Sequence, residues 1–217
     1  GVVVTRNRLL HLCSVILQNS LHVERAVHML KDLVRECRST RRFKQHIPVT
    51  RDALVEMVDL ARVCASGSNK QALKYFVSAD PEQNARIFPT LAWAGYLTDW
   101  PGPAEGERPA AYIIILGDTT ISEGFGVDHG IAAQTIALAA REKGLGTCIM
   151  GAIQRPKLQE ILNIPSHLQI LLVLAIGVPA EKIQLELVGP DGSIKYYRDE
   201  AGVHHVPKRS LEEVLIN

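Results

Sequence analysis

Residues 128–146 read DHGIAAQTIALAAREKGLG, and the character of this stretch governs the architecture expected for the chain. Asp128 is expected to cap a helix that runs from residue 129 to about residue 143, and Gly144 and Gly146 are expected to end it. The helix is crowded with alanine and has little polar surface. It should therefore be buried centrally, with other elements packed around it.

Apolar strands are expected on both sides of this helix in the sequence. Residues 112–116 are apolar throughout, which is the pattern of a central strand buried on both faces, and residues 170–176 repeat it. Shorter strands are expected at residues 73–79 and 183–188. Further helices are expected at residues 50–63, 80–96 and 156–162. The pattern predicts an α+β fold with a mixed central sheet flanked by helices.

Both ends of the chain are expected to reach beyond this compact body. Residues 9–36 have helical periodicity, with a possible break at Asn19-Ser20. Residues 1–28 are predicted to be a helical extension that packs on a neighbouring subunit, ahead of a domain that spans residues 29–217. From Tyr196 onward the chain reads as an extended polar tail that reaches a partner, and Ser210-x-x-Glu213 predicts a capped turn near its end.

Charge and composition exclude several classes of protein. The chain has 24 Lys and Arg against 23 Asp and Glu, whereas bulk binding of nucleic acid needs a net basic face. No apolar run is long enough to span a bilayer, and a signal peptide is not expected because residues 2–17 lack a small-residue cleavage site. Hydrophobic residues make up 47% of the chain, which is enough for a sizeable core.

The cysteines and histidines do not form a pattern that binds metal. The four cysteines are scattered without a C-x-x-C pair, at Cys13, Cys37, Cys64 and Cys148. We therefore expect free thiols in a reducing cytoplasm rather than a disulfide framework or a zinc site. The adjacent His204 and His205 are expected to point to opposite faces of an extended segment.

A first candidate binding motif is Arg38-Ser39-Thr40-Arg41, at the end of the first helical stretch. Arginine offers fork-shaped donors that suit phosphate, and the hydroxyl groups add short hydrogen bonds. Arg41 could also reach the electron-poor edge of a ring, where reduction places negative charge. The alternative is that arginines near a helix C-terminus only complement the helix dipole.

A second candidate is the loop of residues 65–71, which reads ASGSNKQ. Gly67 and the small serines beside it allow the backbone to approach a ligand closely. Asn69 and Gln71 offer both donors and acceptors, which suits a ring edge that carries carbonyl groups and nitrogens. The alternative is an ordinary connection between a helix and a strand.

Two further stretches complete the set. Residues 146–152, GTCIMGA, are not a dinucleotide fingerprint because Ile149 holds the third glycine position, and no P-loop spacing occurs. Their use would be to aim a backbone N–H near Met150 or Gly151 at a ring atom; the alternative is a plain connection. Lys208 and Arg209 could bind phosphate, or could be a solvated basic pair. Together the motifs suggest a phosphorylated aromatic cofactor.

Four motifs, taken in order, resemble those of the FMN-dependent nitroreductase family. They are R-S-x-R-x-F, A-S-G-S-N-K-Q, the alanine-rich helix into residues 144–148, and P-K-R-x-L-E-E. The resemblance covers about residues 29–217. It implies an interlocked homodimer with FMN bound at the subunit interface. It also implies a ping-pong cycle that takes hydride from NADH or NADPH and reduces nitroaromatic, quinone or similar small-molecule acceptors.

The resemblance implies a cofactor site and no dedicated catalytic side chain. Residues near the start and the end of the domain would hold the phosphate, and Arg41 would contact the ring edge. The partner subunit would supply one loop of the site. The implied cofactor-binding residues are Arg38, Ser39, Arg41, Ser66, Asn69, Gln71, Met150, Gly151, Lys208 and Arg209.

The chain departs from the family pattern at several places. Cys37 stands where many members have another arginine or a histidine, and Ala72-Leu73 where Pro-Trp is frequent. Only a short loop, residues 97–108, takes the place of a longer helical insertion found in some members. The sequence therefore does not define the molecule that accepts the electrons. Two alternatives remain: a non-enzymatic flavin-binding module, and a flavin-dependent dehydrogenase or dehalogenase on the same scaffold.

Overall fold

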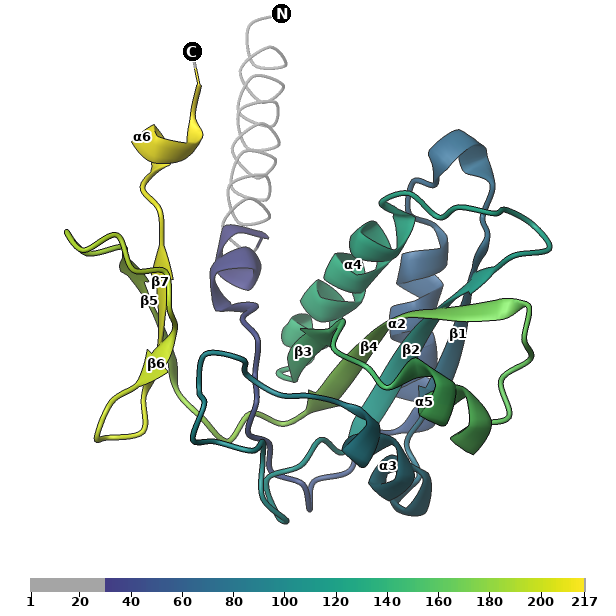
Figure 1. Cartoon of the computed structure of the whole chain (residues 1–217), viewed down its shortest axis with the longest axis horizontal. Coiled ribbons are helices and arrows are strands. Elements are labelled where there is room, and N and C mark those ends of the chain that lie inside the picture. Colours follow the sequence, from purple (N-terminus) through teal and green to yellow (C-terminus); the bar gives the residue numbers. More distant parts are fainter. Residues whose placement is uncertain (1–29, 217) are drawn as a thin grey trace, which may run out of the picture. The chain divides into compact units, whose positions relative to one another are not determined.

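The structure is a computed structural model and describes residues 30–216 (Figure 1). The chain divides into two units, residues 1–36 and residues 37–217, and each is treated by itself. Residues 30–36 of the first unit are helical. The predicted extension over residues 1–28, the break at Asn19-Ser20 and Cys13 lie outside the described residues. Within the described range, no helix combines the length and apolar character that crossing a bilayer requires.

A four-stranded sheet forms the centre of the larger unit (Figure 1). Its strands are β1 (Leu73–Ser78), β2 (Ala111–Asp118), β4 (Leu168–Gly177) and β3 (Gly146–Met150), in this spatial order. Every residue of β2 is buried, as expected for a central strand with an apolar sequence. The α+β class is confirmed. The expected mixed pairing is not found in this sheet, because each of its three strand pairs is antiparallel.

Helices cover both faces of the sheet, and the alternation of side chains along β2 separates two core layers. Ile113 and Ile115 face the helices α2 (Arg51–Arg62) and α4 (Asp128–Glu142). Tyr112 and Ile114 face the helices α3 (Pro81–Ile87) and α5 (Arg155–Ile161). α4 buries mostly alanine against the sheet and α2, as its sequence predicted. The expected central position is wrong, because Ile131 and Gln134 on its other side are exposed.

Two elements differ from the expectation. α3 is followed only by a 3₁₀ turn, Phe88–Thr90, so the helix predicted to reach residue 96 stops early. Pro89 accounts for the stop, since its ring lacks an N–H and clashes with the carbonyl of the preceding helical turn. The stretch GTCIM, for which the sequence predicted a backbone contact with a ring or a plain connection, is the edge strand β3, which pairs along its length with β4.

The chain beyond β4 forms a second sheet, which we call the C-terminal arm (residues 183–216). Its strands β5 (Ile183–Leu187), β7 (His204–Lys208) and β6 (Tyr197–Arg198) lie in that order, with β5 parallel and β6 antiparallel to β7. The short helix α6 (Leu211–Val214) begins with the predicted capping box of Ser210 and Glu213. The tail expected to be extended is therefore partly paired, and the mixed pairing is found here.

The two histidines of β7 face opposite sides of this sheet, as predicted. His204 is fully buried, whereas the ring nitrogens of His205 contact the carboxylates of Glu186 at 2.9 Å and Asp199 at 3.1 Å. Those two contacts raise the pKa of His205 above its usual range. Opposite orientation thus gives neighbouring histidines different partners.

Candidate functional site

A cavity of about 330 Å³ brings four of the predicted binding residues together, although they lie far apart in the sequence. Arg38, Ser39 and Arg41 come from the segment before the sheet, and Lys208 from the end of β7. The other lining residues come from the same segment, α4, β3 and the arm: Cys37, Gln134, Ala137, Thr147, Ile149, Tyr196, His204 and Val206. The first and last motifs of the sequence therefore share one cavity.

The segment that carries the arginines is fixed on the edge of β3. Ser39 forms a parallel bridge with Thr147, and the Thr40 N–H donates to the Thr147 carbonyl at 2.8 Å. Thr40 packs directly on Gly146, where a Cβ atom would lie 2.4 Å from the Thr40 hydroxyl oxygen. A glycine at position 146 is therefore what lets this segment approach the strand.

Arg41 is the most buried of the predicted cationic residues, with 9% of its surface exposed. Its Nη1 donates to the Ser39 carbonyl at 3.3 Å and lies 3.0 Å from Nε2 of His204. Its guanidinium lies 4.4 Å from the centre of the Tyr196 ring, a distance typical of a cation–π contact. The side chain is thus held in one place beside the cavity.

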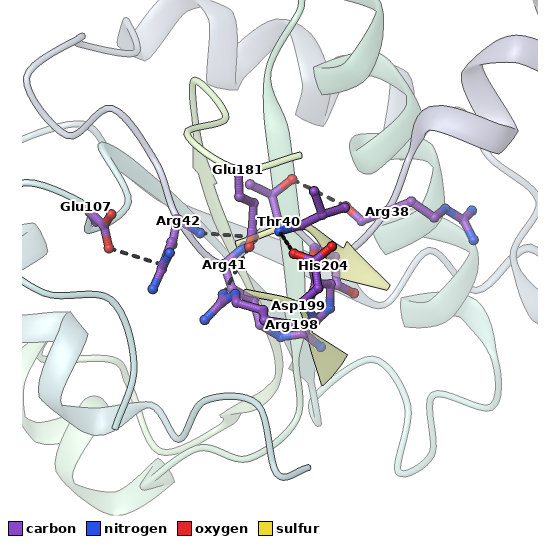
Figure 2. Close-up of polar contacts among 11 residues, drawn as sticks. Arg38, Thr40, Arg41, Arg42, Glu107, Glu181, Arg198, Asp199 and His204 are labelled. Carbon is purple, nitrogen blue, oxygen red and sulfur yellow. Dashed lines mark hydrogen bonds and ion pairs between the residues drawn. The ribbon is translucent and has the colours of Figure 1, made fainter. Parts of the chain in front are cut away.

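A buried glutamate ties the arginine segment to the arm. The side chain of Glu181 is 1% exposed and accepts hydrogen bonds from the backbone N–H groups of Arg41 and Arg42 (Figure 2). Its other oxygen pairs with Arg198 at 3.0 Å. The Arg198 guanidinium in turn lies 4.3 Å from the ring centre of Trp100, in the short loop of residues 97–108. The arginine segment and the arm therefore meet at this carboxylate, and Arg198 connects them to the loop.

The cavity is suited to an anion. Arg38, Arg41 and Lys208 line it, and none of the described lining residues is an aspartate or glutamate. Arginine forks, a serine hydroxyl and a lysine ammonium are the donors that recognise phosphate in proteins. The donor set therefore fits the phosphorylated ligand that the sequence predicted.

Cys37 adds no charge to this donor set. Burial is the main cause that raises the pKa of its thiol, against the lowering effect of the neighbouring Arg38. The thiol also has hydrogen-bond contacts with the side chains of Gln134 and Thr147. It therefore lines the cavity as a neutral group, at a position where a third arginine would add positive charge.

The second motif lies in a different cavity, of about 140 Å³, which Ser66 and Gln71 line together with Asp128. The Asp128 carboxylate accepts from the Ser66 hydroxyl at 2.7 Å and from the Gly67 N–H at 3.0 Å. These donors, Gly67 first, lower the pKa of Asp128. The expected role of Asp128 as N-cap is wrong: Val127 holds that position, and Asp128 in the first turn anchors the loop.

The backbone of this loop is unusual. Ser68, Asn69 and Gln71 have φ values of 51°, 53° and 52°, in the left-handed region that residues other than glycine rarely adopt. Asn69 is exposed and lines neither cavity, although its carbonyl accepts from the Gln71 side chain at 3.3 Å. Such strain persists only where surrounding contacts enforce it, and Asp128 supplies them.

We expect Asp128→Ala to lower the free energy of unfolding by about 1–2 kcal/mol, because it removes the contacts that hold the loop. Folding lowers the pKa of this carboxyl, so its contribution is present above the unfolded pKa and is lost as the pH falls through the folded pKa. Urea unfolding should show a difference at neutral pH that shrinks on acidification. Asp59→Ala is the control, because its exposed ion pair with Arg62 contributes little. Equal losses in both variants would contradict the anchoring role.

The remaining predicted residues are not brought to the first cavity. Met150 is buried in the core at the end of β3, so only its backbone is available for a ligand, and Gly151 follows it on the surface. Arg209 is exposed and pairs with Glu213 at 3.3 Å. The structure thus joins the two phosphate motifs through Lys208 and leaves the ring-binding loop apart from them.

Sequence reasoning missed several residues around the cavity, above all His204, Tyr196 and Glu181. The sequence pattern predicts no metal site at the two histidines of β7 and an extended tail from Tyr196, and neither prediction points to the cavity. Arg41 and His204 are separated by 163 residues, so no local pattern marks their contact. The one available signal is the presence of two tyrosines and a histidine pair within ten residues of the predicted tail.

Comparison with known protein families finds that residues 34–178 match the nitroreductase family. Among curated relatives, the Cr(VI) reductase of Pseudomonas sp. strain G-1 is 26% identical over 176 residues, covering 73% of this chain and 70% of the relative. The iodotyrosine deiodinase of Thermotoga neapolitana is 23% identical over 192 residues, covering 82% of this chain and 97% of the relative.

The fold is also similar to that of solved structures. An FMN-dependent nitroreductase from Clostridium difficile R20291 superposes with a TM-score of 0.57 at 22% identity, covering 69% of this chain and 87% of that protein. At this identity the likeness concerns the fold, and it agrees with the arrangement of sheet and helices described above.

Proposed function

Because the chain belongs to the nitroreductase family, we propose that it is an oxidoreductase that binds FMN and takes electrons from NADH or NADPH. The observation that carries the proposal is the cavity where Arg38, Ser39, Arg41 and Lys208 converge without a carboxylate among the described lining residues. When bound, FMN would supply the redox chemistry, accepting hydride and passing electrons to an acceptor.

The proposed roles of the chain's own residues follow from their positions. Arg38, Ser39 and Lys208 would hold the phosphate, with Arg209 close behind Lys208 in the sequence. Arg41 would place its buried positive charge at the ring edge that becomes negative on reduction, a form of preorganised electrostatic stabilisation. A backbone N–H at Met150 or Gly151 would contact the ring. The proposal requires no side chain to act as a nucleophile or as a general acid or base.

We further propose that the site is completed by a second copy of the chain. Ser66 and Gln71 line a cavity of their own, apart from the one that Arg41 lines. In a homodimer, the loop with Ser66, Asn69 and Gln71 of one copy would reach the ring held by the other. The anchoring of this loop by Asp128 suits a rigid contact surface.

Nitroaromatic compounds and quinones are the proposed acceptors, reduced in a ping-pong cycle. A second candidate is reductive removal of a halogen, since the match with the iodotyrosine deiodinase of Thermotoga neapolitana covers nearly the whole of that relative. Supplying the reduced protein with a nitroaromatic, a quinone and an iodinated phenol in turn, and measuring the rate of reoxidation, distinguishes these classes.

The test is a visible absorption spectrum of the purified protein, recorded anaerobically before and after addition of NADH or NADPH. We expect a yellow protein, or a colourless one that turns yellow with added FMN, whose colour bleaches with one of the nucleotides and returns with the acceptor. FMN should be recovered after denaturation. A protein that binds no FMN would rule out the proposal, and one that binds FMN without turnover would be a flavin-binding module.

A further inference from the structure

Arg41 and His204 meet in the interior although they come from opposite ends of the larger unit. Arg41 Nη1 lies 3.0 Å from His204 Nε2. The imidazole is fully buried and the arginine is 9% exposed. Both residues line the proposed cofactor cavity. The contact therefore belongs to the wall of the cavity and not to the hydrophobic core.

The direction of this hydrogen bond follows from chemistry. An arginine guanidinium is always charged and can only donate, so Nε2 of His204 must accept and Nδ1 carries the hydrogen. Burial and the positive charge of Arg41 lower the pKa of His204 to about 4, which keeps the ring neutral near pH 7. Of the other charges that face the ring, Glu181 opposes this shift, while Arg198 and His205 add to it.

The other nitrogen of His204 argues against a role in stability alone. Nδ1 is buried and has no hydrogen-bond partner among the described residues. Burying an unsatisfied polar atom costs free energy, and an apolar side chain of similar size would avoid that cost. Unlike leucine, the imidazole provides a hydrogen-bond acceptor for Arg41, its Nε2 atom.

Tyr196 limits the same guanidinium from a second direction. Its ring centre lies 4.4 Å from the Arg41 guanidinium carbon and 5.3 Å from the centre of the His204 ring. The guanidinium lies over the face of the tyrosine ring, and the histidine engages one of its N–H groups. Together they restrain a side chain that would otherwise lose much rotamer freedom on binding a ligand.

We infer that His204 is a positioning residue, which uses Nε2 to hold the Arg41 guanidinium in the orientation that binds the cofactor. The inference rests on the proposed function and extends it, since it makes the C-terminal arm a determinant of cofactor affinity. His204 acts through Arg41 and needs no contact with the cofactor itself.

The test measures the dissociation constant of FMN from the apo-protein by quenching of flavin fluorescence at pH 7. We expect His204→Leu to weaken binding about 10-fold, because Arg41 loses its acceptor. His204→Gln should stay within about 3-fold of the unmodified chain, because its amide oxygen can reach the position of Nε2. His167→Leu, an exposed histidine outside this cavity, is the matched control and should change nothing.

A double-mutant cycle separates positioning from a structural effect. If His204 acts through Arg41, His204→Leu should have almost no further effect on FMN affinity in an Arg41→Ala background. An undiminished loss in that background, unchanged affinity in His204→Leu, or equal weakening in the Gln and Leu variants would overturn the inference. If the Leu variant does not fold, His204→Asn replaces it, since its shorter amide cannot reach Arg41.

The same measurements distinguish failure of the inference from failure of the proposed function. If the unmodified chain binds no FMN, the proposed function fails and the inference falls with it. If the unmodified chain binds FMN and the variants at position 204 all bind it equally well, only the positioning role of His204 is wrong.

Discussion

Replacing Arg41 with alanine is expected to weaken FMN binding by about 10- to 100-fold, the range that corresponds to losing a hydrogen bond to a charged group. Arg41 is the buried cation of the cavity, and its side chain is already fixed by Ser39, His204 and Tyr196. Reduction by NADH or NADPH should also become slower, because the positive charge that favours the reduced ring is removed. Fluorescence titration measures the first effect, and stopped-flow absorbance the second.

Comparing FMN with riboflavin tests where Arg41 acts. If it acts at the ring edge, Arg41→Ala should weaken both ligands by similar factors, whereas Arg38→Ala should weaken FMN and leave riboflavin nearly unchanged. Arg51→Ala, at the exposed start of α2, is the matched control for loss of a positive charge. Unchanged retention and unchanged reduction in Arg41→Ala would show that Arg41 has no such role.

The larger elements of the fold could be read from the sequence because each depends on a local pattern. The apolar runs of β2 and β4 are typical of strands buried on both faces, and the alanine-rich stripe of α4 is typical of a helix packed closely against a sheet. The predicted helix starts at residues 50 and 80 agree with the structure, where Thr50 and Asp80 cap their helices through side-chain oxygens. Such signals need no knowledge of the partners across the core.

The errors arise where tertiary contacts override local preference. Asp128 is a good N-cap residue, yet its carboxylate is used by Ser66 and Gly67, which lie about sixty residues earlier. The strand β3 begins at Gly146 and is followed by Gly151, so its sequence resembles a loop. Pairing with β4 makes it a strand. Neither outcome is contained in the local sequence.

The candidate site follows the same division. The arginines and Lys208 could be proposed because phosphate recognition draws on few residue types. Their grouping in one cavity depends on the bridge from Ser39 to Thr147 and on Glu181, which connects the arginine segment to the arm. These long-range contacts have no periodicity, so residue type alone could not identify Glu181 or His204 as part of the site.

Gly146→Ala is expected to lower the free energy of unfolding by about 1–3 kcal/mol and to weaken FMN binding more than any change at a single cavity side chain. The added Cβ would lie 2.4 Å from Thr40 Oγ1, 2.8 Å from its Cβ and 2.9 Å from its Cγ2. Thr40 is buried and hydrogen-bonded to β3, so it cannot turn aside. The whole arginine segment must therefore move away from the strand, taking Arg38 and Arg41 with it.

Urea unfolding and FMN titration of the same variant measure the two effects. The control is Gly130→Ala, in α4, where an added Cβ meets no atom within 4 Å and alanine favours the helix. Thr40→Gly combined with Gly146→Ala should recover part of the FMN affinity, because it removes all three clashing atoms. Full FMN affinity in Gly146→Ala alone would mean that the contact between Thr40 and β3 does not set the position of the arginines.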